Sequence, residues 1–325
     1  MTQDAHAPPT GRELYAEYAA LWHLESIGVL EVLRGRAGAP PPAPPARVAI
    51  IDTSVARDHP CLREAIAGDL ALDLFSTRLG AFTYADPAGA EDRAGARALP
   101  KLGTDIAAGL PLTQALLDEF VDRLSPGQPA HPGGIGPAAA PDFSGHGTAV
   151  AGLVGARPAV MPLAAAGAEG PAAPETLLPL PYCGVDPFCE IVPVSTNFDT
   201  DPEALILAFL YAEVIDARVV LVPRSFPDPF RTTPEIPRLP AGAGTLLEAV
   251  HPCEIGPRAA ELWEELARLI VRVSQRRAVV CAAGNDQEAG AIYPANPPAE
   301  DNGGIAGGGA HAQGRGAGPS DATRP

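Results

Sequence analysis

The sequence predicts an α/β protein built on a mostly parallel sheet with helices on both faces. Three short apolar segments, 189–195, 218–226 and 277–285, have the length and continuous hydrophobicity of buried strands. Two helical patterns, 202–216 and 258–275, separate them. Strands that alternate with helices are joined by right-handed crossovers, so that the strands run parallel and the helices cover the sheet.

The chain before these segments begins with an amino-terminal helix, which we assign to residues 1–38. Residues 39–46, APPPAPPA, cannot continue a helix and predict a stiff linker. The run RVAIID at 47–52 predicts the first buried strand of a main domain that extends to residue 300. Within 12–34, apolar residues recur in steps of three or four, typical of a helix packed on a domain: Leu14, Tyr18, Leu21, Leu24 and Ile27.

Two segments depart from the strand and helix pattern. Residues 75–141 are rich in Gly and Pro and predict a long surface insertion with one helix, at 111–124. Residues 301–325 contain one Ile and no Val, Leu, Phe, Tyr or Trp. A buried strand made of glycines is costly, so we expect this Gly-rich tail to be disordered.

Charge and composition exclude several classes of protein. The formal net charge is −16, with no basic stripe to neutralise phosphates, which excludes nucleic acid as a partner. No apolar stretch is long enough to span a membrane and no signal-peptide pattern opens the sequence, so we expect a cytoplasmic protein. The five cysteines indicate reduced thiols, with a Cys183–Cys189 pair as the alternative: Cys61, Cys183, Cys189, Cys253 and Cys281.

Three polar residues indicate a catalytic site only when they are considered together. Asp52 ends a predicted strand, His146 lies between two glycines, and Asn285 ends another strand. Each alone fits a structural role, as a turn former, a core histidine or part of a tight turn. Together they supply a carboxylate to orient an imidazole, a general base, and an amide donor for an oxyanion. These three groups are the apparatus of acyl transfer.

The segments around these residues resemble the subtilisin-like serine peptidases. The matching motifs are VAIIDTSVARDHP at 48–60, SGHGTAVAGLVG at 144–155 and VVCAAGND at 279–286, which follow the family order. Residues 182–194 are similar to the family's G-V-A-P turn with its following strand, and IYPA at 292–295 is similar to the family's Tyr-Pro-Ala. The resemblance covers about residues 47–300 without the insertion, and it implies the subtilisin-like fold.

The resemblance also implies a role for each site residue. Asp52 would orient the base, His146 would be the base, and Asn285 would stabilise the oxyanion. Ser225 and Gly284 would bind a polypeptide substrate, which pairs with the enzyme strand to strand. The implied function is a serine-type endopeptidase.

The family carries its nucleophile in a later G-T-S-x-A-x-P segment, which this sequence lacks. Ser320 is a poor substitute, because Pro319 takes the place of the Thr and only five residues follow, too few for the helix. We therefore expect the amino-terminal part of a peptidase, truncated or frame-shifted, whose nucleophile lies downstream or on a companion chain. The alternatives are a catalytically inactive, peptide-binding relative and a nonfunctional product.

No cofactor or metal is expected from the sequence. Some members of the family bind calcium, which leaves Asp142 and Asp186 as alternatives for cation ligands. No calcium-loop pattern supports them, and acidic loop residues are usually solvated.

Overall fold

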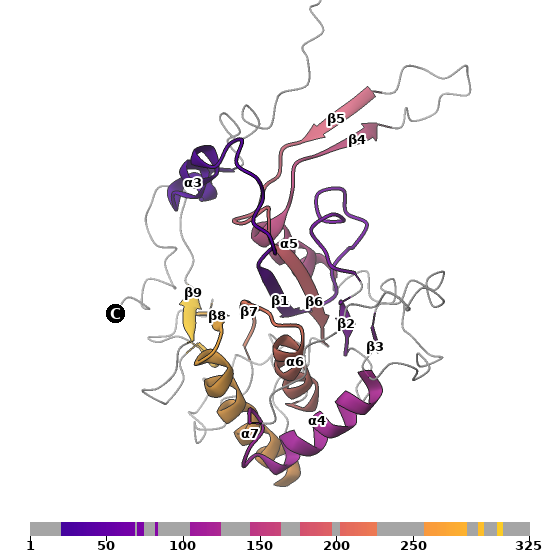
Figure 1. Cartoon of the computed structure of the whole chain (residues 1–325), viewed down its shortest axis with the longest axis vertical. Coiled ribbons are helices and arrows are strands. Elements are labelled where there is room, and N and C mark those ends of the chain that lie inside the picture. Colours follow the sequence, from indigo (N-terminus) through magenta and orange to yellow (C-terminus); the bar gives the residue numbers. More distant parts are fainter. Residues whose placement is uncertain are drawn as a thin grey trace, which may run out of the picture.

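Seven strands form one sheet in the computed structural model, in the order β3-β2-β6-β1-β7-β8-β9 (Figure 1). All neighbouring strands pair in parallel except β2 and β3. The strands are β1 (Arg47–Asp52), β2 (Leu72–Asp73), β3 (Phe82–Thr83), β6 (Glu190–Ser195), β7 (Val219–Val222), β8 (Ala278–Ala282) and β9 (Ile305–Gly307). The structure describes residues 21–68, 70–74, 82–83, 105–124, 144–163, 176–196, 202–225, 257–284, 292–295 and 304–307.

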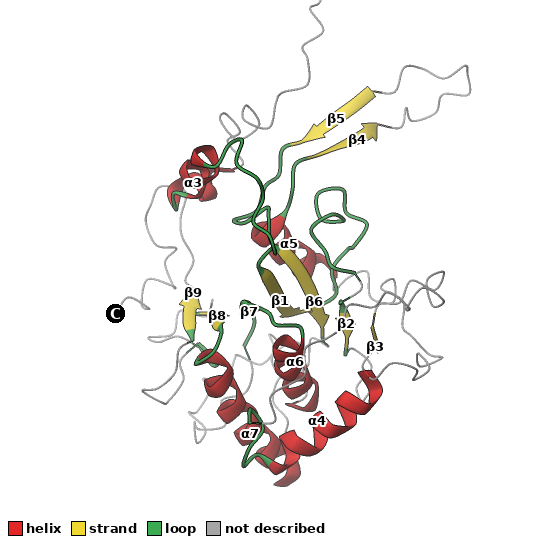
Figure 2. Cartoon of the chain, viewed as in Figure 1, coloured by secondary structure: helices red, strands yellow, loops and turns green. Residues whose placement is uncertain are grey.

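Both faces of this sheet are covered by helices, as Figure 2 shows. The main helices are α4 (Pro111–Leu124), α5 (Ser144–Gly155), α6 (Pro202–Val214) and α7 (Pro257–Ser274). Alternate side chains of β1 face opposite ways, so that Val48 and Ile50 pack with Ala151 of α5, while Ala49 and Ile51 join the larger core under α6 and α7. The predicted α/β class with a mostly parallel sheet is therefore confirmed.

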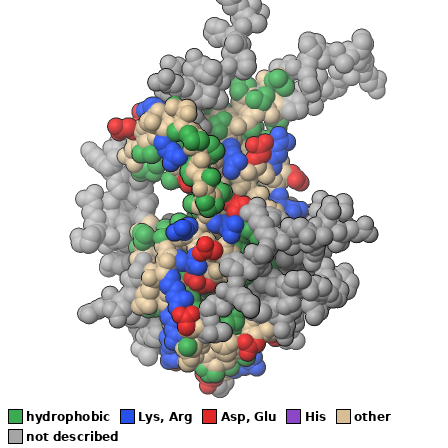
Figure 3. Space-filling model, viewed as in Figure 1, with side chains coloured by type: hydrophobic (Ala, Val, Ile, Leu, Met, Phe, Trp, Pro, Cys, Tyr) green, Lys and Arg blue, Asp and Glu red, His purple; other side chains and the backbone are tan. Residues whose placement is uncertain are grey.

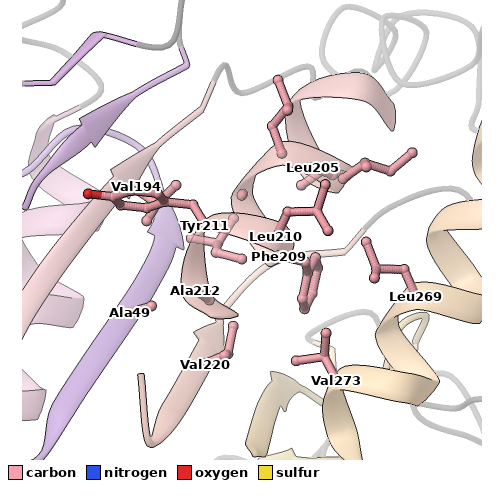
Figure 4. Close-up of a cluster of buried hydrophobic side chains, with 14 of the residues drawn as sticks. Ala49, Val194, Leu205, Phe209, Leu210, Tyr211, Ala212, Val220, Leu269 and Val273 are labelled. Carbon is pink, nitrogen blue, oxygen red and sulfur yellow. The ribbon is translucent and has the colours of Figure 1, made fainter. Parts of the chain in front are cut away.

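Helix α6 is apolar on nearly every side because the sheet covers one side of it and α4 and α7 pack on the others. Figure 4 shows Leu205, Phe209 and Leu210 of α6 in the same cluster as Leu269 and Val273 of α7. This burial fixes α6 under the strands β1, β6 and β7.

Arginine–carboxylate pairs hold the amino ends of the strands. Arg47 at the start of β1 pairs with Glu190 at 2.6 Å, and Arg277 before β8 pairs with Glu213 at 2.5 Å. Basic and acidic side chains lie among one another over α7 in the space-filling view (Figure 3). At the other end of the sheet, β7 stops at Val222, before the end predicted at 226. Pro223 follows and has no N–H to continue the ladder.

The predicted surface insertion at 75–141 also contributes to the main core through its described helical part, α4, which is exposed on one side and buried on the other. The predicted helix at 111–124 is confirmed as α4, but Leu116 and Leu117 are buried in the main core. The buried carboxylate of Glu265 on α7 accepts hydrogen bonds from the backbone N–H groups of Leu112 and Thr113 and from the Thr113 hydroxyl. It therefore caps the first turn of α4, whose N–H groups have no partner within the helix.

The amino-terminal helix is described from residue 21, and there it is two short helices, α2 (Trp22–Ser26) and α3 (Val29–Gly35). Gly28, with φ +77°, separates them. Leu21 and Leu24 are buried with Cys183, as their spacing predicts, whereas Ile27 is 60% exposed because the helix stops before it. Leu14 and Tyr18 lie outside the described residues.

The short strands β2 and β3, a hairpin and an edge strand were not predicted. An antiparallel hairpin of β4 (Ala159–Leu163) and β5 (Thr176–Leu180) projects from the body (Figure 1). Residues 305–307 form the exposed edge strand β9, so that the expectation of disorder is wrong for these three residues. Among the described residues, no helix has the length and hydrophobicity needed to cross a membrane.

Candidate active site at the carboxyl ends of the strands

Asp52 is the last residue of the central strand β1, and only 1% of it is exposed. Its Oδ1 accepts a hydrogen bond from the backbone N–H of Thr53 at 2.6 Å. In parallel α/β sheets functional groups gather at the carboxyl ends of strands, because the loops and helix starts converge there. A buried carboxylate at this position needs partners, and the second partner comes from α5.

His146 lies in the first turn of α5 and points its Nδ1 at Asp52. Nδ1 lies 2.8 Å from Oδ2 and 2.9 Å from Oδ1, although the two residues are 94 positions apart in the sequence. The His146 side chain is 57% exposed, while that of Asp52 is 2% exposed. Donation from Nδ1–H leaves Nε2 as the basic nitrogen, on a ring that solvent and substrate can reach.

Two hydrogen bonds join the loop after Asp52 to the first turn of α5. The Gly147 N–H donates to the Thr53 hydroxyl at 3.0 Å, and the Ala56 N–H donates to the Thr148 hydroxyl at 2.9 Å. The Gly147 N–H is one of the first four in α5, which lack an acceptor within the helix, so Thr53 acts as a distant cap. These bonds hold the helix that carries His146 against the strand that carries Asp52.

The structure places two of the three remaining predicted site residues. Ser225 is exposed and comes three residues after the end of β7. Gly284 comes two residues after the end of β8 and has φ +112°, where a Cβ would also approach Ile292 to 2.9 Å, so only glycine fits. Asn285 lies outside the described residues. The described strand ends that carry these residues, those of β1, β7 and β8, are neighbours in the sheet.

No group of three or more His, Cys, Asp or Glu side chains that could hold a metal ion occurs within the described part of the chain. Asp186 instead accepts a hydrogen bond from the Phe188 N–H at 3.0 Å, and Asp142 lies outside the described residues.

The four cysteines that the structure describes are buried thiols that form no disulfide with one another: Cys61, Cys183, Cys189 and Cys281. The alternative of a Cys183–Cys189 disulfide is therefore wrong. Burial raises the pKa of the thiols of Cys189 and Cys281 to about 12, which makes them unreactive core residues. Cys253 lies outside the described residues.

Sequence reasoning missed four polar residues around the predicted pair. Thr53 and Thr148 make the hydrogen bonds described above, and Arg224 donates to the hydroxyl of Thr196 at 2.7 Å. A threonine in a loop or in the first turns of a helix carries no local sign of such a partner. Arg224 gave one signal: it is a cation within the apolar segment 218–226.

A buried acid paired with an accessible imidazole, at the carboxyl edge of a parallel sheet, is typical of hydrolases that work by acyl transfer. The family comparison makes this class specific: the model of the subtilase family matches residues 46–317. The chain belongs to the subtilase family, a family of serine-type peptidases. A comparison with curated protein sequences found no match.

Several solved structures are similar to the chain at low identity. The PatG macrocyclase domain has 16% identity and a TM-score of 0.44, over 90% of this chain and 64% of that one. The epidermin leader peptide processing protease EpiP of Staphylococcus aureus, as an S393A mutant, has 16% identity and a TM-score of 0.43, over 88% and 51%. The nisin leader peptidase NisP of Lactococcus lactis has 16% identity and a TM-score of 0.43, over 87% and 60%. The chain thus spans less than two thirds of the length of these structures.

Proposed function

We propose that this chain is the Asp- and His-bearing part of a serine-type endopeptidase that hydrolyses peptide bonds by acyl transfer. The observation that carries the proposal is the contact of His146 Nδ1 with both carboxylate oxygens of Asp52, at 2.8 and 2.9 Å. Membership of the subtilase family supports it.

In this mechanism His146 Nε2 takes the proton of the nucleophilic hydroxyl as that oxygen attacks the carbonyl carbon of the substrate. Asp52 keeps the proton on Nδ1 and stabilises the imidazolium that forms. His146 then gives the proton to the leaving amine, and water repeats the sequence to release the acyl group. Asn285 donates to the oxyanion, while Ser225 and Gly284 hold the polypeptide substrate.

The nucleophilic Ser is the component that these 325 residues do not supply, because no G-T-S-x-A-x-P segment occurs in them. The proposal therefore includes a Ser-bearing segment, either encoded further along the same gene or carried by a companion chain. The first experiment is to sequence the gene and several hundred bases beyond it, and to translate them in all three frames.

The second experiment tests the chemistry. The chain is produced together with the Ser-bearing segment and treated with a fluorophosphonate probe, and the labelled residue is located by mass spectrometry while cleavage of a peptide library is measured. We expect labelling of that Ser and cleavage of the library. His146→Ala abolishes both, and Asp52→Asn lowers kcat by about 10⁴, as in other serine-peptidase triads.

A matched histidine variant controls for loss of folding. His59 lies on the loop that follows Asp52, but its Nδ1 accepts a hydrogen bond from the Cys61 N–H, which gives it a structural role. His59→Ala keeps the labelling and the cleavage that His146→Ala abolishes. Equal loss in the two variants would contradict the assignment of His146 as the base.

The second candidate function is a catalytically inactive protein that binds peptides at the same carboxyl edge of the sheet. The lack of the Ser segment within the sequence favours it. It is established if no Ser-bearing segment is encoded nearby and the purified chain binds library peptides without labelling or cleavage. That result would overturn the peptidase proposal.

A further inference from the structure

Arg224 connects the ends of two strands that flank the strand carrying Asp52. Among its contacts, its Nη1 donates to the hydroxyl of Thr196 at 2.7 Å. Arg224 follows β7 and Thr196 follows β6, and β1 lies between these two strands. The side chain therefore passes across the end of β1.

The strand register puts the two residues at the same level. Asp52 pairs with Ser195 on one side, and Ile50 pairs with Leu221 on the other. Continuing both registers places Thr196 and Arg224 one residue beyond Asp52, on its two sides. Because neighbouring strands lie about 4.8 Å apart, the contact spans roughly 10 Å of sheet, which requires a long side chain.

The side chains of β6 and β7 that lead toward this contact alternate between the two faces of the sheet. Val194 of β6 and Val220 of β7 face the core under α6, as Figure 4 shows. Thr196 and Arg224 continue these even-numbered positions. Asp52 continues Val48 and Ile50, which face α5. The contact lies just beyond the ends of β6 and β7, while the Asp52 carboxylate faces His146.

Thr196 also contacts Asp52 directly, through its backbone. Its backbone N–H donates to the carbonyl oxygen of Asp52 at 2.8 Å, and its side chain is fully buried. Hydroxyl groups buried in this way require a partner, and a guanidinium makes the stronger, charge-assisted bond. Arg224 is thus linked to the backbone of Asp52 through Thr196. Arg224 is also followed directly in the chain by Ser225.

We propose that Arg224 is a positioning residue, which fixes Asp52 through Thr196 and fixes Ser225 as its neighbour in the chain. The part that concerns the reaction rests on the proposed peptidase function. A site that works by proton transfer tolerates little displacement, and a shift of 1 Å can lower the rate about 100-fold. One side chain thus holds both the residue that orients the base and a residue predicted to bind substrate.

The experiment compares Arg224→Ala, Arg224→Lys and Thr196→Val with the unchanged chain. Amide hydrogen exchange, followed by mass spectrometry or NMR, reports the opening of each backbone bond without any need for activity. The matched amide is Glu190 at the other end of β6, which donates to Ala46. The control variant is Arg268→Ala, because Arg268 is exposed on α7 and pairs only with Glu264 among the interactions described.

We expect exchange at the Thr196 amide to become roughly tenfold faster in Arg224→Ala and Thr196→Val, with Glu190 unchanged. Arg224→Lys restores part of the protection, since an ammonium keeps the charge but not the reach of the guanidinium fork. With the Ser-bearing segment present, Arg224→Ala raises KM and lowers kcat, so that kcat/KM falls roughly 10- to 100-fold. Arg268→Ala changes none of these values.

Two results overturn the proposal. If Thr196 and Glu190 exchange faster by the same factor, Arg224 contributes only to global stability. If Thr196 exchange does not change, Arg224 positions nothing. Should the unchanged protein prove inactive, the peptidase proposal fails, and the exchange at Thr196 still decides whether Arg224 holds the backbone of Asp52.

Discussion

Replacement of Gly147 by alanine tests whether the close approach of α5 to β1 builds the Asp52–His146 pair. Gly147 follows His146, and a Cβ at this position would lie 2.4 Å from the Thr53 carbonyl oxygen and 2.8 Å from that of Ser54. Both contacts are with backbone, so no side-chain rotation relieves them. The helix and the loop after Asp52 must move apart by about 1 Å to reach an ordinary contact of 3.4 Å.

The cost follows from three terms. Overpacking against backbone costs about 2 kcal/mol, and loss of the Gly147 hydrogen bond to the Thr53 hydroxyl costs about 1 kcal/mol. The better helix propensity of alanine returns about 1 kcal/mol. The free energy of unfolding should therefore fall by about 2 kcal/mol in Gly147→Ala.

Gly152→Ala is the matched control, because Gly152 lies in the same helix and a Cβ there meets nothing within 4 Å. It should stabilise the protein by up to about 1 kcal/mol through propensity alone. The assay is urea unfolding of both variants, where a difference of about 3 kcal/mol is large compared with the error of extrapolation. If Gly147→Ala unfolds within about 0.5 kcal/mol of Gly152→Ala, the close approach does not hold the helix, and the reasoning is refuted.

Two further predictions concern buried groups away from the site. Glu265→Gln should lower the free energy of unfolding by about 2 kcal/mol, because the cap on α4 loses its charged acceptor. The control variant Glu264→Gln removes one partner of an exposed ion pair and should lower it by less than about 0.5 kcal/mol. Equal effects of the two variants in urea unfolding would refute the cap. Burial raises the pKa of Cys189 and Cys281 from the ordinary 9.0 to about 12. Below pH 9 both thiols are protonated in the folded and the unfolded chain, and above it only the unfolded chain loses these protons. The free energy of unfolding should therefore fall between pH 9 and 12, more steeply than in a variant with both cysteines replaced by alanine; identical slopes would contradict the thiol assignment.

The predicted strands and helices were largely correct because their signals are local. The segment 47–52 became β1 with the predicted bounds, and 111–124 became α4. The errors arose where one residue or one contact decided the outcome. Pro223 ended β7 early, and Gly28 divided the amino-terminal helix.

The candidate site was predicted in part. The order of the motifs around Asp52 and His146 predicted that the two side chains would meet, and the structure brings them to 2.8 Å. Their catalytic roles remain a proposal, together with that of Asn285, which lies outside the described residues. The residues that hold the pair in place, Thr53 and Arg224, were not predicted.

The sequence by itself determined the class of fold, the order along the chain of the four central strands β1, β6, β7 and β8, and the motif that carries the histidine, because periodicity and motif spacing are properties of neighbouring residues. Only the tertiary structure decided that Thr53 caps α5, that Glu265 caps α4 and that Arg224 crosses the end of β1. Thr53 and Gly147 are 94 residues apart, and Glu265 and Thr113 are 152 apart. A hydrogen bond needs its two groups within about 3 Å of each other, and over such separations only the packing of the helices on the sheet sets that distance.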